Sequence, residues 1–309
     1  MTNKSIHKMH EIIYKICNKS KLLKENTKIQ RNKNRDYVYL YDPLILSRIV
    51  GHLKHGINHN KSGKRYQIFM RGQIADYPGM VPTIYRDLQN SSTKLQNRIK
   101  AYKELIGKLP KTLDKTRFRG DVGGATLQHY GIKTPWIDIV DNLFVAIWFA
   151  INKITNKEPF EYNRRNKKDY GWIYFIQVED GQPDDHGIIS GKETKWCDLR
   201  SSQTPLSLRP RTQHGLSVCR INWDTNNYDD YVLDKFVLAT VKFPINNKFV
   251  SLINDIIPSS LNYMFPSSTY DNTYKVLRNE KVTDIIKSVT IKCNLSTDDL
   301  GKIYLYADS

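Results

Sequence analysis

The sequence has little that would support metal-centred, disulfide-stabilised or membrane-bound function. Its four cysteines lie far apart and form no C-x-x-C pair, which argues against a zinc site or a disulfide framework. No apolar run reaches the ~18 residues that a membrane-spanning helix needs, and no apolar leader follows the first residues. We therefore expect a soluble protein of a reducing cytoplasm that does not enter a membrane.

Familiar catalytic signatures are also missing. The chain has no glycine-rich phosphate loop, no H-E-x-x-H pair and no serine–histidine–aspartate order. His52, His55 and His59 lie close together, but Gly56 is expected to break the helix that would align them as ligands. The clustered carboxylates of a metal-dependent nuclease are missing too. The sequence therefore predicts no metal site.

Acidic residues are scarce relative to basic ones. The chain has 31 Asp and Glu against 48 Lys and Arg, a formal net charge of +17. Such an excess favours a polyanionic partner, RNA or DNA, although a lysine-rich composition without any binding role would look the same. Residues 1–66 are the most basic part, and a second basic stretch follows at residues 152–169. With tyrosine and tryptophan as stacking faces, these two segments would suit a nucleic-acid-binding module.

The distribution of apolar residues predicts a mixed architecture. Helices are expected at residues 6–23, 42–53, 88–106, 143–150 and 249–257, and residues 24–35 are expected to form a loop. Strands are expected at residues 66–70, 134–140, 171–178, 216–221, 236–243, 285–291 and 303–305. This irregular interspersion fits an α+β domain better than a regular βαβ array. We expect a basic, mostly helical segment at residues 1–65, followed by an α+β domain at residues 66–309.

Two polar positions stand out against this apolar pattern. Asp138 lies in a short buried strand just before the apolar helix that starts at Leu143. A carboxylate there is unfavourable unless it is hydrogen-bonded, so Asp138 is either a tie that pins the helix start or a reactive group. Arg71 leaves an early strand directly into Gly72. Its guanidinium could hold a phosphate or carboxylate while the glycine lets a ligand approach the backbone, although an ordinary surface ion pair is the alternative.

The order of these motifs resembles the FRG-domain family. The matching positions are Met70–Gln73, Pro82–Arg86, Leu127–Gly131, Asp138, Val145–Ala150, Arg209–Arg211, Gln213, Gly215 and Met264–Pro266. The likeness covers most of residues 66–278. The literal Phe118-Arg119-Gly120 is not the family motif, because the family's arginine–glycine pair precedes the proline–arginine segment. The chain departs from the family at Met70, where an aromatic residue is usual, and at Lys133, Ile139 and Val140.

The resemblance implies a layout like that of the ADP-ribosyltransferases. Such a fold is α+β, with small mixed or antiparallel sheets and flanking helices around a cleft, and it uses NAD as substrate. Asp138 and Gln213 would be the catalytic pair, with Gln213 in place of the usual glutamate, so that Asp138 supplies the negative charge. Arg71 would hold the pyrophosphate or ribose, and the Gly72 backbone would hold the nicotinamide amide. The remaining NAD-binding residues would be Gln128, Tyr130, Arg86 and Arg211.

These implications give two functional hypotheses. The first is an ADP-ribosyltransferase-like enzyme, an NAD glycohydrolase or a toxin of this kind, acting on a nucleic acid or a protein. The second is a non-catalytic nucleic-acid-binding module; a further protein partner, such as an antitoxin, is left open. The first hypothesis predicts that Arg71, Asp138 and Gln213 converge on one cleft, together with Gln128, Tyr130 and Arg211.

Overall fold

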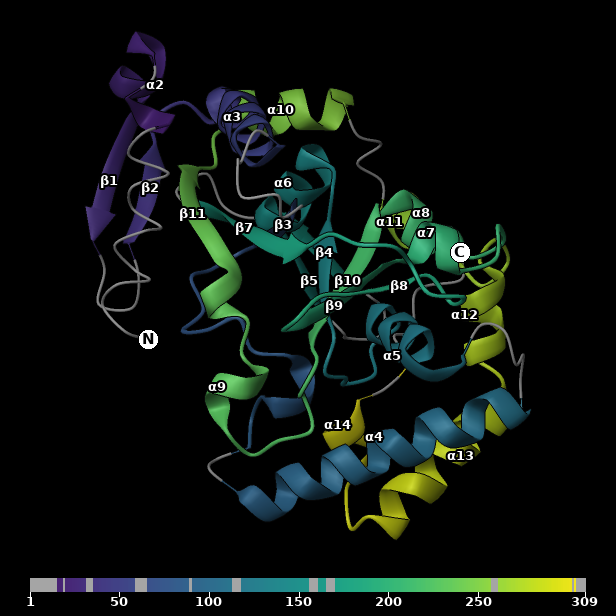
Figure 1. Ribbon diagram of the computed structural model, residues 1–309. Coiled ribbons are helices and arrows are strands. Elements are labelled where there is room, and N and C mark those ends of the chain that lie inside the picture. The colour runs from purple at the N-terminus through teal and green to yellow at the C-terminus, as the bar shows by residue number, and fades with distance from the viewer. Residues whose placement is uncertain are drawn as a thin grey trace.

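The computed structural model describes residues 16–18, 20–31, 36–58, 66–88, 91–112, 118–155, 161–164, 170–256, 261–301 and 303. Within these residues the chain forms one nine-stranded sheet, a two-stranded ribbon and thirteen α-helices (Figure 1). The predicted α+β class is confirmed. The predicted set of small sheets is wrong, because most strands join a single large sheet.

The nine strands lie in the order β1-β2-β11-β7-β3-β4-β10-β9-β8. Their bounds are β1 Thr27–Arg31, β2 Asp36–Leu40, β11 Val237–Pro244, β7 Tyr170–Glu179, β3 Tyr66–Gln73, β4 Ile137–Val140, β10 Gly215–Arg220, β9 Thr194–Asp198 and β8 Ile188–Ser190. The ribbon consists of β5 (Asn152–Thr155) and β6 (Glu161–Arg164), within the basic stretch at residues 152–169.

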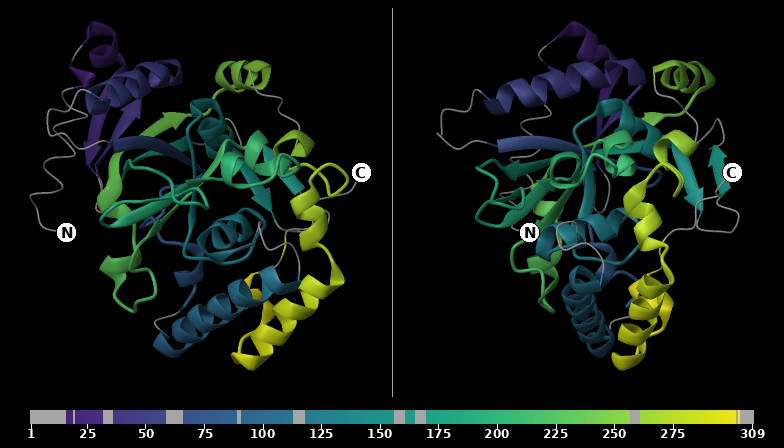
Figure 2. Two further views of the ribbon diagram at one scale, coloured as in Figure 1. Left: turned by 45° about the vertical axis from the view of Figure 1, so that its right-hand side comes forward. Right: turned by 90° about the vertical axis from the view of Figure 1, so that its right-hand side faces the viewer.

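Helices flank the sheet on both sides. Figures 1 and 2 show α3 (Leu46–Asn58), α6 (Leu143–Ile151) and α10 (Asn247–Ile256) on one side, and α4 (Ser92–Thr112) beside α13 (Glu280–Lys292) on the other. The remaining helices are α2 Lys21–Asn26, α5 Gly120–His129, α7 Leu199–Ser202, α8 Leu208–Thr212, α9 Tyr228–Tyr231, α11 Leu261–Met264, α12 Asn272–Leu277 and α14 Thr297–Leu300. Short 3-10 turns are η1 Pro43–Ile45, η2 Thr83–Tyr85 and η3 Asp234–Phe236. None of the helices in the described part of the chain combines the length and hydropathy that a membrane-spanning segment requires.

The sheet has a weak seam between β3 and β4. β3 pairs with β7 along its whole length, from Tyr66 to Gln73, but with β4 only through Met70 opposite Val140. We call this pair the sheet junction. It separates a five-stranded half-sheet, β1-β2-β11-β7-β3, from a four-stranded half-sheet, β4-β10-β9-β8. Beyond Met70, the two strands diverge.

The sheet is also strongly curved. Phe69 of β3 and Trp196 of β9 have ring centroids 4.9 Å apart. Two strands lie between β3 and β9 in the sheet order, and in a flat sheet β3 and β9 would be about 14 Å apart. Phe69 and Trp196 therefore meet inside the curve and help to form an apolar core between the half-sheets. A larger core lies under α3, α6 and α10.

Gly72 fixes how closely α6 approaches β3. A Cβ atom at this position would lie 1.7 Å from the backbone oxygen of Ala146 in α6. No other residue fits there, because the contact is with backbone rather than with a flexible side chain. Gly72 is therefore required by helix packing. This explains the glycine without the ligand approach that the sequence suggested.

Several predicted elements need correction. Residues 24–35, expected to be a loop, contain the end of α2 and all of β1. The predicted strand at 285–291 is part of helix α13, which Asn279 caps and which buries Val282, Ile286 and Val289. These three residues recur every three or four positions, which is helical spacing. α3 also continues through Gly56 to Asn58.

The segment before residue 66 also contributes to the main sheet. β2 pairs in parallel with β11, Val38 lying opposite Val241 and Tyr39 opposite Lys242. Its described residues therefore include two strands as well as helices. Most of the helix predicted at residues 6–23, and the strand predicted at 303–305 apart from residue 303, lie outside the described residues.

Candidate functional site

Four polar side chains from separate elements meet next to the sheet junction. Arg71 follows Met70 on β3, Asp138 lies on β4, His129 ends α5, and Gln213 follows α8. The Arg71 guanidinium donates through Nη1 to the backbone oxygen of Asp138. Asp138 Oδ1 lies 3.2 Å from His129 Nε2, and the Gln213 amide hydrogen-bonds the imidazole. We call Arg71, His129, Asp138 and Gln213 the junction cluster.

The electrostatics of the junction cluster are set by unequal burial. His129 is 3% exposed, whereas the Asp138 side chain is 33% exposed. Burial lowers the pKa of His129; the Asp138 carboxylate opposes this, while Arg209 and Arg71 reinforce it. The imidazole is therefore neutral at neutral pH.

The Asp138 carboxylate retains hydrogen-bonding capacity. Although Oδ1 lies near His129, the two atoms are not aligned as a hydrogen bond, and Oδ1 is buried. A buried carboxylate oxygen without a well-aligned donor is unfavourable unless a ligand or a proton supplies the missing interaction. With its remaining surface open to solvent, the Asp138 carboxylate can act on a bound molecule.

Gln213 supports His129 from the buried side. It is 3% exposed, and its Nε2 donates to the backbone oxygen of Met264 at 2.7 Å. Gly215 lets the His129 ring pack against the backbone just after Gln213, since a Cβ at Gly215 would lie 2.6 Å from His129 Cε1. Gln213 therefore contacts the imidazole and the chain near α11. Its position is that of a residue that orients His129.

Tyr130 belongs to a buried network beside the cluster. Its hydroxyl donates to Asp271 Oδ2 at 2.8 Å, and the same oxygen accepts the backbone N–H of Arg209. The Arg209 guanidinium lies over the rings of Tyr130 and Phe265, 5.2 and 4.5 Å from their centroids. Tyr130 is fully buried, so it fixes the end of α5 against α8 and α12.

The other predicted NAD-binding side chains lie in different contacts. Gln128 Oε1 accepts hydrogen bonds from the hydroxyls of Thr83 and Thr134, at 2.8 and 2.9 Å. Arg211 Nε donates to the backbone oxygen of Pro205. Arg86 Nε donates to the backbone oxygen of Val81. The Arg86 residue also lines a pocket of about 700 Å³. Of the six residues expected to converge, the structure thus brings together Arg71, Asp138 and Gln213. His129, which joins them, was not among those six.

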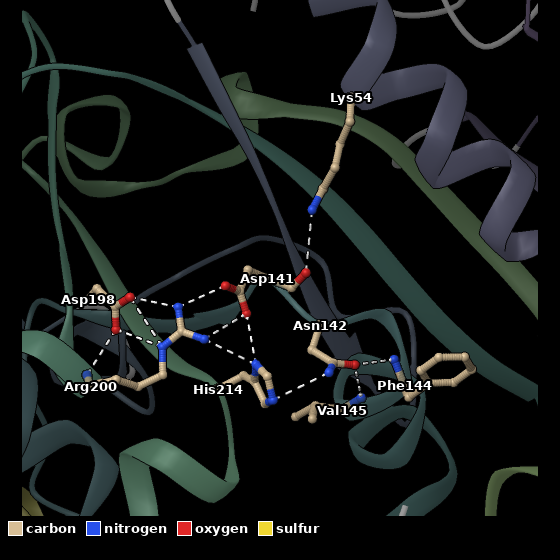
Figure 3. Close-up of polar contacts among 8 residues, drawn as sticks. All are labelled: Lys54, Asp141, Asn142, Phe144, Val145, Asp198, Arg200 and His214. Carbon is tan, nitrogen blue, oxygen red and sulfur yellow. Dashed lines mark hydrogen bonds and ion pairs between the residues drawn. The ribbon is translucent and has the colours of Figure 1, made fainter. Parts of the chain in front are cut away.

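A second polar cluster lies just beyond Asp138 on the chain (Figure 3). In it the Arg200 guanidinium lies between two carboxylates, with Nη2 2.7 Å from Asp141 Oδ2 and 2.6 Å from Asp198 Oδ2. His214 Nδ1 lies 3.1 Å from Asp141 Oδ1, and His214 Nε2 lies 3.3 Å from Asn142 Nδ2. We call these five residues the latch.

The latch ties three parts of the chain to the start of α6. Asn142 Oδ1 caps α6 by accepting from the backbone N–H groups of Phe144 and Val145. Burial raises the pKa of Asp141, but hydrogen bonds from Arg200 and His214 outweigh this and hold it below its usual range. The sequence indicated only the cap, because Arg200 and His214 lie 59 and 73 positions away from Asp141.

The comparisons with known proteins agree with the position of the junction cluster. The sequence profile of the FRG domain matches residues 66–159, which include Arg71, His129 and Asp138. No match was found among curated proteins or among solved structures. Within the described residues, no three His, Cys, Asp or Glu side chains come together as possible metal ligands.

Proposed function

Because the chain carries an FRG domain that contains most of the junction cluster, we propose that the protein is an ADP-ribosyltransferase-like enzyme with NAD as substrate. The observation that carries this proposal is the sheet junction. The solvent-accessible carboxylate of Asp138 and the guanidinium of Arg71 lie where the two half-sheets separate. The neutral His129 lies beside the carboxylate. Strands that part in this way leave backbone edges and side chains facing a ligand.

Arg71 and Asp138 have complementary tasks in this proposal. The bond from Arg71 Nη1 to the Asp138 backbone oxygen fixes the guanidinium beside the carboxylate. A planar guanidinium is the side chain best suited to an anionic group such as a pyrophosphate. The edge of β3 beyond Met70 offers peptide groups on the side where pairing with β4 has ended. An amide such as that of nicotinamide is a suitable partner for such an edge.

The chemistry needs a negative charge near the ribose. In ADP-ribosyl transfer the bond from ribose C1′ to nicotinamide breaks, and its electron pair leaves with the nicotinamide. An acceptor oxygen or nitrogen then bonds to C1′ and loses a proton to a nearby base or to water. The transition state resembles an oxocarbenium ion, which a carboxylate stabilises. In this scheme Asp138 supplies the charge, His129 lies against the carboxylate on its buried side, and Gln213 contacts His129 rather than the ribose.

NAD binding is the first test. Saturating NAD, at about one hundred times its dissociation constant, should stabilise the wild-type protein by ~2.7 kcal/mol and raise its melting temperature. Arg71→Lys keeps the charge but lacks the fork, so it should lose most of this rise. Arg48→Lys, at an exposed position on α3, is the matched control and should behave like wild type.

Turnover is the second test. Nicotinamide release, and transfer of labelled ADP-ribose to RNA, DNA or protein, would separate a transferase from a glycohydrolase. If the wild-type protein shows no NAD-dependent rise in melting temperature and no nicotinamide release with these acceptors, the enzyme proposal fails. The alternative would then be a non-catalytic nucleic-acid-binding module, which the net charge of +17 favours.

A further inference from the structure

We propose that the outer part of one face of the five-stranded half-sheet binds single-stranded nucleic acid. This part lies on β1, β2, β11 and the start of β7, and we call it the aromatic platform. The proposal stands on its own observations and does not rest on the proposed function.

Strand pairing places the platform residues in one row. Across β1, β2, β11, β7 and β3 the residues directly opposite one another are Lys28, Tyr39, Lys242, Trp172 and Gln73. Residues opposite each other in neighbouring strands point to the same side of a sheet. The alternate residues Val38 and Val241 face the core under α3, α6 and α10. The row therefore lies on the side of the sheet that these helices do not cover.

Burial limits the platform to the outer strands of this row. Trp172, Tyr174 and Thr240 are 7%, 1% and 3% exposed. Trp172 and Tyr174 belong to the apolar core between the half-sheets. Arg71 lies opposite Tyr174, so this covered stretch separates the platform from the junction cluster.

Aromatic rings and a lysine are concentrated on this face. Lys242 Nζ lies 4.1 Å from the ring centroid of Tyr170, 5.2 Å from that of Trp172 and 5.6 Å from that of Tyr37. Tyr39 packs edge-on against Tyr41 and Tyr170, with ring centroids 5.3 and 6.1 Å away. Tyr41 and Tyr170 are 55% and 39% exposed. A cluster of exposed aromatic rings on a sheet indicates a binding surface.

The chemistry of the platform fits a single strand better than a duplex. Bases stack on aromatic side chains only when they are unpaired, and lysines such as Lys28 and Lys242 attract the phosphates between them. The four strands β1, β2, β11 and β7 span about 14 Å at their usual spacing, which is room for a few nucleotides. The alternative is that Lys242 only stabilises the sheet through its contacts with neighbouring rings. That role does not explain why Tyr41 and Tyr170 are exposed.

Binding is measured by fluorescence anisotropy with a labelled single-stranded RNA of about ten nucleotides at low salt. The test variant is Lys28→Glu combined with Tyr41→Ala, both at exposed positions. The matched control is Lys275→Glu with Tyr270→Ala, which makes the same changes of charge and ring at exposed positions near α12. The test variant should bind about tenfold more weakly or worse, with a shallower salt dependence, and the control should stay near wild type.

Other outcomes overturn the proposal. Equal weakening in the test and control variants would show a general charge effect. Tighter binding to a duplex than to the single strand would exclude stacking on the platform. If neither RNA nor DNA binds at low salt, the proposal fails and a protein partner becomes the alternative for this face. The two proposals remain separable, because the platform variant should keep the NAD-dependent rise in melting temperature. Conversely, if wild type shows no NAD response while the platform variant still loses RNA, only the enzyme proposal fails.

Discussion

The junction cluster and the latch both contain an arginine, a histidine and an aspartate, and their aspartates, Asp138 and Asp141, lie three positions apart. They differ in how fully these charges are paired. In the latch, Arg200 bonds two carboxylates at once, and Asp141 also contacts His214. In the junction cluster, the Asp138 carboxylate contacts His129 without hydrogen-bond alignment and stays accessible. A histidine, an aspartate and an arginine therefore make a structural tie when the carboxylates are bonded to the cation. We propose that they make a reactive centre where a carboxylate keeps capacity for a ligand.

Asp138→Asn should have the largest effect of the changes that distinguish the two clusters. The change removes the charge while preserving the shape, so nicotinamide release should fall about a hundredfold or more. The melting temperature should stay nearly the same, because the backbone oxygen that accepts from Arg71 remains. Steady-state release and thermal unfolding measure the two effects. A large loss of stability with normal release per folded molecule would make Asp138 the structural tie.

Arg200→Ala should give the opposite result in the latch. It leaves Asp141 and Asp198 close together without their cation, and we expect a loss of about 2 kcal/mol. Complete burial would make this larger, but the Arg200 side chain is 25% exposed. Denaturant unfolding measures the change, with the exposed Arg48→Ala as control. NAD binding by the folded fraction should be retained; its loss would extend the reactive centre to the latch.

Asn142 separates the helix cap from the histidine contact. Asn142→Ala removes both and should destabilise the protein by about 1 kcal/mol. Asn142→Asp keeps an acceptor for the Phe144 and Val145 N–H groups and loses only the Nδ2 donor to His214. A carboxylate is also favourable at a helix N-terminus, so Asn142→Asp should cost less than Asn142→Ala. Equal losses in denaturant unfolding would show that the His214 contact, not the cap, carries the effect.

The smallest expected effect is a difference in the pH at which the two clusters lose their contribution to stability. Burial lowers the pKa of His129, so the unfolded chain takes up a proton that the folded chain does not, and stability is lost as pH falls below about 6.5. In Asp141 burial is outweighed by Arg200 and His214, and the lowered pKa removes stability only as pH falls below about 3.9. Thermal unfolding across pH should show two separate declines. Asp141→Asn should weaken the lower decline, to which the lowered pKa of the ion-paired Asp299 also contributes, and leave the upper decline unchanged.

The sequence predicted those elements whose apolar pattern is local. β3, β7, β10, β11 and α6 are near their expected positions, since each is a short apolar run with a clear end. α13 was mistaken for a strand, because its apolar residues near Ile286 also fit a short buried run. β1 was missed because its polar residues pair with β2 at the edge of the sheet, and such pairing leaves little periodicity.

The site could be predicted only where a motif marked it. Arg71 and Asp138 lie in the stretch that matches the FRG domain, and Gln213 was predicted from the resemblance alone. The contacts of His129 depend on several elements meeting. Arg200 and His214 carry no local sign of the latch, because Asp141, which both contact, lies more than fifty positions away from each. Gln128 and Tyr130 looked available for a ligand, but their polar atoms are bonded to Thr83, Thr134 and Asp271.

The sheet junction also has a mechanical consequence. Tension between β1 and β8 would cross a ladder of one residue pair, Met70 with Val140. The load would then fall on side-chain packing, on α6 against both half-sheets and on Phe69 against Trp196. Regions with few backbone hydrogen bonds open first. Pulled apart at these two edge strands, the sheet would therefore separate along this seam, at Arg71 and Asp138, before either half-sheet unfolds.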